Sequence, residues 1–193
     1  MSNVRPHHKH AVTSTSSVVT LRLMTEQDIP MLHEWLGQPH IVEWWGGEER
    51  RPTLSETRAH YLPRVLAKDR VTPYIAMLGN VPIGYAQSYV ALGCGEGWWE
   101  DETDPGVRGI DQSLAHPDLL SKGLGTQLVT SLVELLFLDP TVTKIHTDPA
   151  PTNARAIRCY EKAGFRRIGT IVTPDGPAVY MVQERPPQAA RVA

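Results

Sequence analysis

The chain has 193 residues, with 19 Lys and Arg against 21 Asp and Glu, which gives a formal net charge of −2. This length suits a single domain with a substantial core, and the near balance of charges argues against a general role on nucleic acids or membrane surfaces. No apolar run approaches the ~20 residues that a membrane-spanning helix needs, and the N-terminal residues lack the apolar region of a secretory signal.

The first elements are predicted from hydrophobic period and capping residues. Residues 1–17 carry a His cluster and a Ser/Thr run, which indicates a disordered tail. Residues 18–24 alternate and are rich in β-branched side chains, so we predict a strand. Capping-box patterns at 25–28 and 53–56 each open a helix, and Pro63 is expected to kink or shorten the second one.

The rest of the chain alternates between strands and helices. We predict strands at 73–78 and 83–92 joined at Gly79-Asn80, a loop at 93–106, a strand at 107–114, a helix at 123–137, a strand at 143–148, a helix at 153–163, and closing strands at 165–173 and 178–184. Residues 185–193 are predicted to form a C-terminal tail. This order favours a single α/β or α+β domain over residues 18–184.

Residues 121–126, which read Ser-Lys-Gly-Leu-Gly-Thr, are the most informative stretch. Two glycines let a backbone pass close to a phosphate, and the following helix offers unpaired N–H donors at its N-terminus. Taken alone, the pattern is explained more often by a tight turn between a strand and a helix. It lacks the spacing of a Walker loop and the third glycine of a dinucleotide-binding fingerprint.

Further motifs follow this loop at a defined distance. A strand at 143–148 is followed by Asn153 at a helix start, and then by Tyr160 four residues before Gly164-Phe165. This order resembles the GNAT acetyltransferase superfamily. The segments 41–47, 84–89, 97–99, 104–112 and 173–178 are similar to those of aminoglycoside 6'-N-acetyltransferases, so the resemblance covers roughly residues 18 to 183. It departs at Leu120, where the superfamily usually has Gln or Arg.

The resemblance implies a GNAT fold, in which a mixed, mostly antiparallel sheet flanked by helices splays between strands four and five. It implies acetyl-CoA as co-substrate and direct transfer to the 6'-amine of an aminoglycoside antibiotic in a ternary complex, which confers resistance. The implied cofactor-binding residues are Ser113, Leu114, Lys122, Gly123, Leu124, Gly125, Thr126, Asn153 and Tyr160. The implied substrate-binding residues are Trp45, Glu96, Trp98, Asp111, Ser113, Asp148 and Asp175. We expect a monomer without a metal, a nucleic-acid partner or a membrane.

Asp111 lies in the middle of a predicted strand, where a carboxylate is unfavourable unless it is paired or functional. Pairing with Arg108 or capping a local backbone is one explanation. The resemblance instead makes Asp111 the base that meets the attacking amine. Proton transfer from an alkylammonium to an ordinary Asp is uphill by roughly 6 pKa units, or ~9 kcal/mol. Burial could raise the pKa of Asp111, a water could relay the proton, or the carboxylate could position the amine; we favour positioning with a water relay.

Acidic and aromatic residues near the predicted site have structural and functional explanations. Asp148 precedes a proline, as in an ordinary turn, but a polycationic substrate needs several converging carboxylates. The acidic loop at 93–106 is mostly a solvated surface, yet together its charges would form a negative mouth. The Trp doublets at 44–45 and 98–99 are expected in loops as an aromatic wall for the sugar rings.

Tyr160 and Cys159 are neighbours on one predicted helix. Tyr160 could pack in the core, and the resemblance also makes it the acid that protonates the departing thiolate. Cys159 is expected to be a buried structural thiol rather than a nucleophile. Cys94 and Cys159 form no disulfide framework and lack metal-ligand spacing, which favours reduced thiols in a cytoplasmic protein.

Two other functions stay open at this point. The same fold could acetylate a protein N-terminus or a polyamine, because fold alone does not fix the substrate. A non-catalytic acyl-CoA-binding module is a third possibility, although it would not need Asp111, Asp148 and Tyr160. Within the aminoglycosides, relatives with Ser at the position of Ser113 favour gentamicin, and those with Leu favour amikacin.

Overall fold

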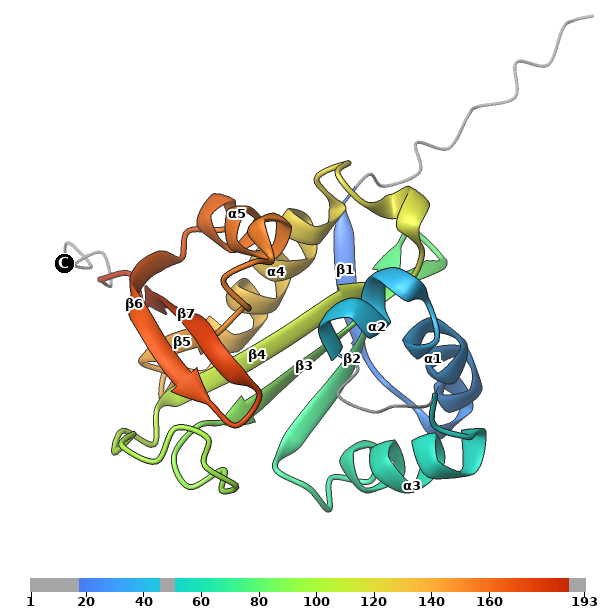
Figure 1. The fold of residues 1–193 in the computed structure, drawn as a ribbon, viewed down its shortest axis with the longest axis horizontal. Coiled ribbons are helices and arrows are strands. Elements are labelled where there is room, and N and C mark those ends of the chain that lie inside the picture. Colours follow the sequence, from blue (N-terminus) through green and yellow to red (C-terminus); the bar gives the residue numbers. More distant parts are fainter. Residues whose placement is uncertain (1–17, 46–50, 188–193) are drawn as a thin grey trace, which may run out of the picture.

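The computed structural model describes residues 18–45 and 51–187, and within these ranges the strands form one seven-stranded sheet in the order β1-β2-β3-β4-β5-β7-β6 (Figure 1). The strands are β1 (Val19–Leu23), β2 (Val71–Leu78), β3 (Val81–Val90), β4 (Val107–Leu114), β5 (Lys144–Thr147), β6 (Arg166–Thr173) and β7 (Gly176–Glu184). The α-helices are α1 (Ile29–Leu36), α2 (Pro39–Trp45), α3 (Leu54–Val65), α4 (Leu124–Phe137) and α5 (Ala154–Lys162), with 3-10 turns at Glu26–Asp28 and Pro117–Leu119. The predicted tail at 1–17 lies outside the described residues, as do 188–193.

Every neighbouring pair of strands is antiparallel except β4 and β5, which run parallel. That pair is short, because only 107–109 of β4 align with 144–146 of β5. Beyond Gly109, β4 continues to Leu114 with β3 on one side, and no strand of the described ranges pairs with it on the side of β5. The predicted splay between the fourth and fifth strands is therefore confirmed.

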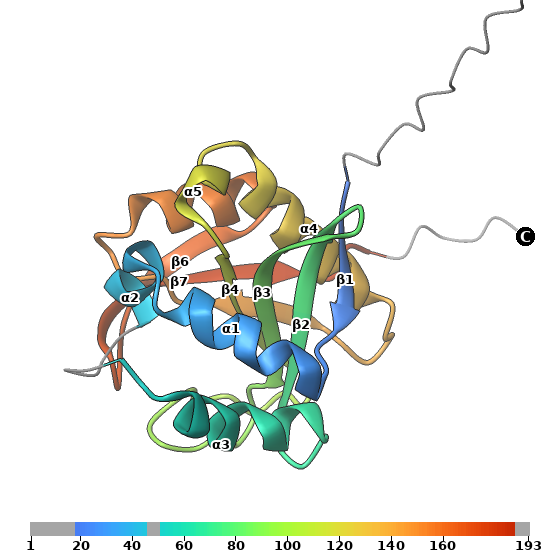
Figure 2. The ribbon, with the colours of Figure 1, turned by 90° about the vertical axis from the view of Figure 1, so that its right-hand side faces the viewer.

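Both faces of the sheet are covered by helices, because side chains alternate along each strand. On β2, Ala76 belongs to the core cluster formed with Leu128 and Leu132 of α4, whereas Ile75 belongs to the cluster formed with α1. Figures 1 and 2 show the same arrangement, with α1 and α3 on one side of the first strands and α4 on the other. The functional region lies where the sheet opens between these layers.

Several local predictions are confirmed with small shifts. Leu78 pairs with Val81 across the two-residue Gly79-Asn80 turn, and this tight pairing starts β3 two residues earlier than predicted. Glu56 accepts from the Thr53 backbone N–H at 2.7 Å, as a capping box requires. Pro63 lies in the last turn of α3, which ends two residues later. None of the helices in the described part of the chain is long and apolar enough to cross a bilayer.

Candidate active site

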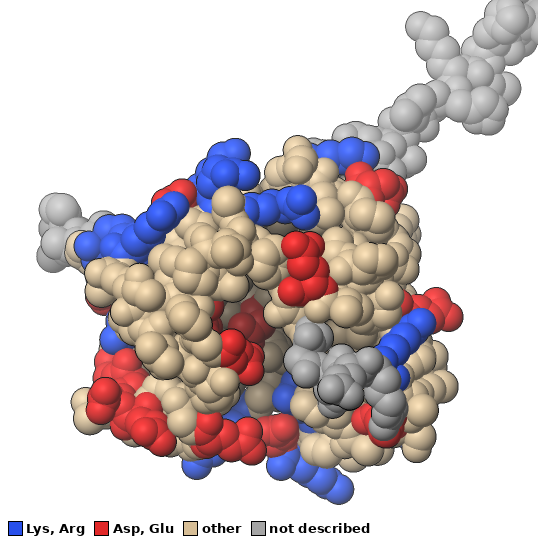
Figure 3. All heavy atoms as spheres, viewed as in Figure 1, with Lys and Arg blue, Asp and Glu red and all other residues tan. Residues whose placement is uncertain are grey.

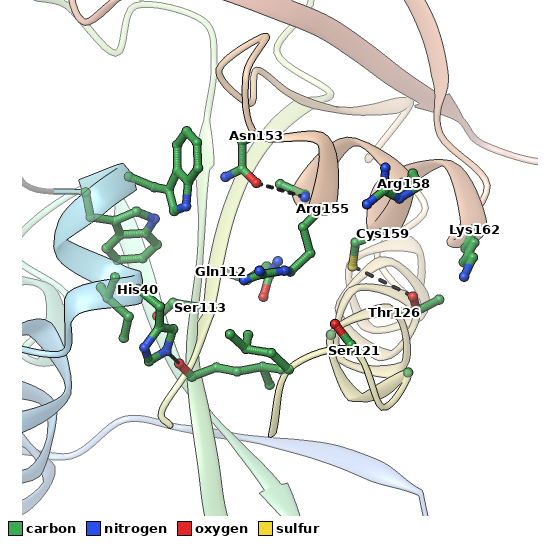
Figure 4. Close-up of a pocket in the computed structure, with 18 residues that line it drawn as sticks. His40, Gln112, Ser113, Ser121, Thr126, Asn153, Arg155, Arg158, Cys159 and Lys162 are labelled. Atoms are coloured by element: carbon green, nitrogen blue, oxygen red, sulfur yellow. Dashed lines mark hydrogen bonds between the residues drawn. The ribbon is translucent and has the colours of Figure 1, made fainter. Parts of the chain in front are cut away.

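A cleft of about 280 Å³ opens at the splay, between α2, the end of β4, the loop before α4, and α5 (Figure 4). Ser113 and Leu114 of β4 line its floor. The other lining residues are His40, Ile41, Trp44, Trp45, Gln112, Leu120, Ser121, Gly123, Gly125, Thr126, Asn153, Arg155, Ala156, Arg158, Cys159 and Lys162. The cleft is therefore built by segments from four separate parts of the sequence.

The glycine loop ends at the N-terminus of α4, on the wall of this cleft. Gly123 is the N-cap residue and has a φ of 80°, a left-handed conformation that side chains rarely adopt. A Cβ there would meet nothing within 4 Å, so conformation rather than space requires the glycine. At Gly125 a Cβ would lie 3.4 Å from the Cys159 sulfur, which is an ordinary van der Waals contact, so helix packing alone does not require this second glycine. Both glycines line the cleft, and the first N–H groups of α4 lie beside it.

Helix α5 supplies three cations to the cleft wall along its length: Arg155, Arg158 and Lys162. They are spaced three and four residues apart, which places them on one side of the helix. None of the three forms an ion pair among the described residues. The motif analysis missed them, although their helical spacing after Asn153 was visible in the sequence. They give this end of the cleft a positive charge.

Asn153 lies at the start of α5, as predicted, and it also reaches the cleft. Its side-chain oxygen accepts from the Ala156 backbone N–H at 3.0 Å, which caps α5. Its side chain also lines the cleft, where Figure 4 shows it above Arg155.

The first Trp doublet lies on a helix, which corrects the prediction that Trp44 and Trp45 are in a loop. Together with His40 and Ile41 they turn one side of α2 toward the cleft. His40 anchors this helix to the floor, because its Nε2 is 2.9 Å from the Leu114 carbonyl oxygen. Helix α2 has only seven residues and starts at a proline, so its hydrophobic period was too short to identify from the sequence.

Three carboxylates from distant parts of the chain interact beside this cleft. Asp111 lies on β4 two residues before Ser113, which is about 7 Å along a strand. Asp148 follows β5, and Asp175 lies in the turn between β6 and β7. Their charges act on one another, since Asp175 helps to raise the pKa of Asp111 and both help to raise that of Asp148. In Figure 3 acidic atoms lie deep in the hollow between the two halves of the molecule.

Burial is the largest influence on the pKa values of Asp111 and Asp148. It raises the pKa of Asp111, against the opposing effects of a hydrogen bond from Gln87 and the charge of Arg64. Burial, with the nearby charges of Asp111 and Asp175, raises the pKa of Asp148 to about 7. Of the three explanations for proton acceptance by Asp111, a raised pKa is thus supported by its surroundings.

The partner of Asp111 is on the neighbouring strand. Gln87 stands directly opposite it in the β3–β4 register, and the Gln87 Nε2 donates to Asp111 Oδ2 at 2.8 Å. Arg108 instead donates to the carbonyl oxygens of Pro105 and Val107. The alternative in which Asp111 pairs with Arg108 is therefore wrong, since residues three apart on a strand point to opposite faces.

Tyr160 is buried and packs edge-on against Phe165, with 5.4 Å between ring centroids. Burial, with the charge of Asp111, raises the pKa of Tyr160 well above its usual range. The phenol therefore keeps its proton at neutral pH and can act only as a donor. Cys159 is half-buried and lines the cleft, which corrects its assignment as a buried thiol. Burial raises the pKa of this thiol, so it is not an activated nucleophile.

The carboxylates of the acidic loop are of two kinds, those bonded to β5 or the residue before it and those exposed to solvent. Glu102 pairs with Lys144 at 3.1 Å, and Asp104 accepts from the Thr143 hydroxyl at 2.6 Å. Glu96, Glu100 and Asp101 are exposed. The region of this loop forms a predominantly acidic rim in Figure 3, opposite the basic side chains near α5.

Trp99 fixes the acidic loop to the sheet. Its ring stacks on His146 of β5 with 3.7 Å between centroids, and its Nε1 donates to the Tyr89 hydroxyl at 3.1 Å. His146 is fully buried, and burial lowers its pKa to about 3, so the stacked imidazole is neutral. The sequence predicts no role for His146, because its stacking on Trp99 brings together a strand and a loop that are far apart in the chain.

The structure thus brings most predicted site residues into two adjacent groups. Trp45, Ser113, Leu114, Gly123, Gly125, Thr126 and Asn153 line the cleft, and Asp111, Asp148, Asp175 and Tyr160 interact beside it. Four others are not part of the cleft wall. Lys122 is exposed, Leu124 packs against the core, Glu96 is an exposed loop residue, and Trp98 is half-buried with its carbonyl accepting from the Cys94 thiol.

Comparison with known proteins gives consistent matches. Residues 24–173 match the family model described as an acetyltransferase (GNAT) domain. The chain is 72% identical over 174 residues to the aminoglycoside N(6')-acetyltransferase type 1 of Klebsiella pneumoniae, covering 90% of this chain and 87% of that protein. A solved structure of AAC(6')-Ib with parmomycin and acetyl-CoA matches with a TM-score of 0.83 and 72% identity, covering 87% of this chain and 94% of the other. The structure of AAC(6')-Ib with coenzyme A and kanamycin has a TM-score of 0.82 and 71% identity, covering 86% and 95%.

Proposed function

This chain belongs to the GNAT acetyltransferase family, and we infer that it is an aminoglycoside 6'-N-acetyltransferase that uses acetyl-CoA and confers resistance to these antibiotics. The observation that carries the substrate assignment is the group of three carboxylates beside a cleft with a cationic opposite end. A polyanionic acyl donor and a polycationic acceptor can then meet at the floor of one site.

The residues of the cleft fit acetyl-CoA. Arg155, Arg158 and Lys162, which have no ion-pair partner among residues 18–45 and 51–187, are cations suited to phosphate groups, and the N–H groups at the start of α4 lie beside the same cleft. The open edge of β4 near Ser113 and Leu114 offers backbone donors and acceptors for an extended arm. When bound, acetyl-CoA supplies the acetyl thioester that is attacked by an amine.

The carboxylates fit a polyamino sugar. Asp111 can hold the reacting amine and accept its proton, directly or through a water, while Asp148 and Asp175 hold other ammonium groups. Trp45 offers a ring surface at the boundary between the two regions. The exposed acids of the 93–106 loop, including Glu96, would raise the encounter rate of a multivalent cation.

Tyr160 is suited to give a proton to the departing sulfur. Its phenol stays protonated across the physiological pH range, and the charge of Asp111 contributes to its raised pKa. Its neighbour Cys159 lines the cleft as a neutral thiol, which supports direct transfer rather than an acetylated enzyme. We further propose a single acetyltransferase domain over 18–184 that acts as a cytoplasmic monomer without a metal.

The test is a thiol-release assay with purified protein, acetyl-CoA and kanamycin or tobramycin. We expect turnover with both antibiotics and an acetyl group on the 6'-nitrogen by NMR. The matched control is an aminoglycoside with a hydroxyl in place of the 6'-amine, which should bind without releasing thiol. Turnover of spermidine or a peptide N-terminus, but of no aminoglycoside, would replace this function with one of the alternatives.

A further inference from the structure

A line of hydrogen bonds runs from α3 to the carboxylate of Asp111. Gln87 lies at its centre, because the Gln87 Nε2 donates to Asp111 Oδ2 at 2.8 Å. Its Oε1 accepts two hydrogen bonds, one from the Tyr85 hydroxyl at 2.8 Å and one from Arg64 Nη1 at 3.0 Å. Arg64 is held in turn by an ion pair with Asp69 at 3.4 Å and by the face of the Tyr61 ring, whose centroid is 5.2 Å away.

We propose that Gln87, held by Tyr85 and Arg64, is a positioning residue that keeps Asp111 ionised and aimed at the substrate amine. The inference rests on the proposed function, and it assigns roles to residues outside both the cleft wall and the carboxylate group.

The orientation of the Gln87 amide is determined by its partners. An amide has one acceptor end and one donor end, and both donors from Tyr85 and Arg64 point at the acceptor. The NH₂ end must therefore face Asp111. Tyr85 is fully buried and packs edge-on against Trp45 and Tyr61, so its hydroxyl has a fixed place. Rotation of the amide by 180° would place its NH₂ group against the Arg64 guanidinium and its oxygen against the Asp111 carboxylate, and both of those hydrogen bonds would be lost.

This orientation matters because burial and the charge of Asp175 both oppose the negative charge of Asp111. The titratable or charged groups that interact with it are Arg64 and Tyr61 of α3, Tyr85 and Tyr89 of β3, Tyr160 of α5, and the carboxylates of Asp148 and Asp175. Among these groups Arg64 carries the positive charge, and it reaches Asp111 through the amide of Gln87 rather than by direct contact. Without this donor, burial and the two other carboxylates would favour protonated Asp111.

Fixing one carboxylate oxygen also leaves the other available. Gln87 occupies Oδ2, so Oδ1 is the oxygen that can receive an ammonium group or a water. The neutral Gln87 amide fixes the orientation of the carboxylate, and it does so without pairing the negative charge with a cation in direct contact.

Gln87→Glu is the decisive variant. The new carboxylate would still accept from Tyr85 and Arg64, which preserves the fold, but it would place a second acidic oxygen against Asp111 Oδ2. We expect the acid limb of kcat/KM for tobramycin to move up by about one to two pH units, because a lost hydrogen bond to a charged group is worth that much in pKa. At pH 7 kcat/KM should fall about tenfold or more, with the deficit narrowing as the pH rises and the KM for acetyl-CoA unchanged.

Three further measurements separate positioning from stability. Gln87→Met and Arg64→Met should shift the same limb in the same direction, with the smaller shift for Arg64→Met because Tyr85 still orients the amide. Calorimetry without acetyl-CoA should show weaker tobramycin binding to Gln87→Glu at pH 7. The matched control is Gln127→Met, since Gln127 makes one hydrogen bond to Val19 on the far side of the sheet. It should lower the melting temperature without moving the pH profile.

The outcomes are distinguishable. Wild-type protein that does not acetylate tobramycin would refute the proposed function. Active wild-type protein whose folded Gln87→Glu and Arg64→Met variants keep the wild-type pH profile would overturn the positioning role alone. A profile moved equally by Gln127→Met would also overturn it, because the shift would then report only lost stability.

Discussion

Asp111 is a half-buried carboxylate in the middle of β4. Asp111 lies where desolvation opposes its charge, and a single neutral donor from the neighbouring strand compensates in part. This leaves its pKa above that of an ordinary Asp, which reduces the uphill transfer from an ammonium group. The pKa of Tyr160 is also raised, so its phenol stays protonated at neutral pH. The surroundings thus make Asp111 a better proton acceptor and keep the Tyr160 phenol protonated.

Asp111→Asn should reduce kcat far more than affinity for acetyl-CoA. The amide keeps the shape of the carboxylate but cannot accept the amine proton or balance its charge. We expect kcat to fall by about 10²-fold or more, as for other general bases. Steady-state kinetics and calorimetry of acetyl-CoA binding measure the two effects. Turnover within a few-fold of wild type would demote Asp111 to a structural carboxylate.

Ser113 should control the preference among aminoglycosides. It lines the cleft two residues after Asp111, so the two side chains lie on the same face of β4. We expect good turnover of tobramycin, kanamycin and gentamicins with a primary 6'-amine, and weaker turnover of amikacin. Ser113→Leu should move the amikacin-to-gentamicin ratio of kcat/KM by roughly 10-fold, within the range for one side chain in a pocket. An unchanged ratio would remove Ser113 as the determinant.

At the scale of elements, helix ends and strand ends create the site. The parallel pairing of β4 and β5 stops after three residues, and this opens the floor of the cleft. The N-terminus of α4 and the basic side of α5 then flank the opening. Helix α2 closes the opposite wall and is fastened to β4 through His40.

The glycine loop allows a test with a matched control. Gly123→Asp should weaken acetyl-CoA binding at least tenfold, because it adds a negative charge beside the phosphates. Gly79→Asp is the control, since Gly79 also has a left-handed φ of 60° with open space around it but lies in the β2–β3 turn. Both variants should lose similar stability through backbone strain.

Calorimetry distinguishes the two variants. Only Gly123→Asp should lose acetyl-CoA affinity. Equal affinity in folded Gly123→Asp and wild type would contradict the assignment of this loop to the phosphates.

At the scale of the whole molecule, charge is separated along the site. The basic side chains of α5 lie at one end and the acidic loop and carboxylate group at the other, although the net charge is only −2. Such an arrangement attracts both substrates to their own ends but concentrates like charges in the folded state. Repulsion between these like charges therefore lowers the stability of the fold, while the same charges favour binding of the substrates.

Asp148→Asn should reveal this conflict. Burial and the neighbouring carboxylates raise the pKa of Asp148 to about 7 in the folded protein, whereas an ordinary Asp side chain has a pKa of 3.8, so wild-type stability falls as the pH rises between these values. An Asn side chain does not ionise, so the variant lacks this loss of stability. Its free energy of unfolding should exceed that of wild type at pH 8 by roughly 1–4 kcal/mol, with little difference near pH 4. Thermal unfolding at both pH values measures it. A wild-type protein that is equally or more stable at pH 8 would show that Asp148 is not destabilised by its surroundings.

The same variant should bind the aminoglycoside less well. Its KM for tobramycin should rise most at pH 8, where wild-type Asp148 is ionised, and much less at pH 6. The defect should shrink as salt screens the contact in wild type. A KM that is raised equally at all pH values would indicate lost packing rather than lost charge.

Much of this protein follows from local sequence signals. Turn residues and hydrophobic periods predict β4 and α4 almost to the residue, since both elements are long and bounded by clear breakers. The left-handed Gly123 before a helix was visible as a candidate phosphate site, and Asp111 stood out as a carboxylate in the middle of a strand. These signals depend only on neighbours in the chain.

The tertiary structure decided what no local pattern could. Whether Asp111 pairs with Arg108 or with Gln87 depends on the register of β3 and β4, which brings together residues 24 apart. The charge of Asp175 helps to raise the pKa of Asp111, and both charges help to raise the pKa of Asp148, only because the splayed strands and a distant turn meet in space. Electrostatic coupling and desolvation depend on distance and on excluded water, and the folded chain alone sets both.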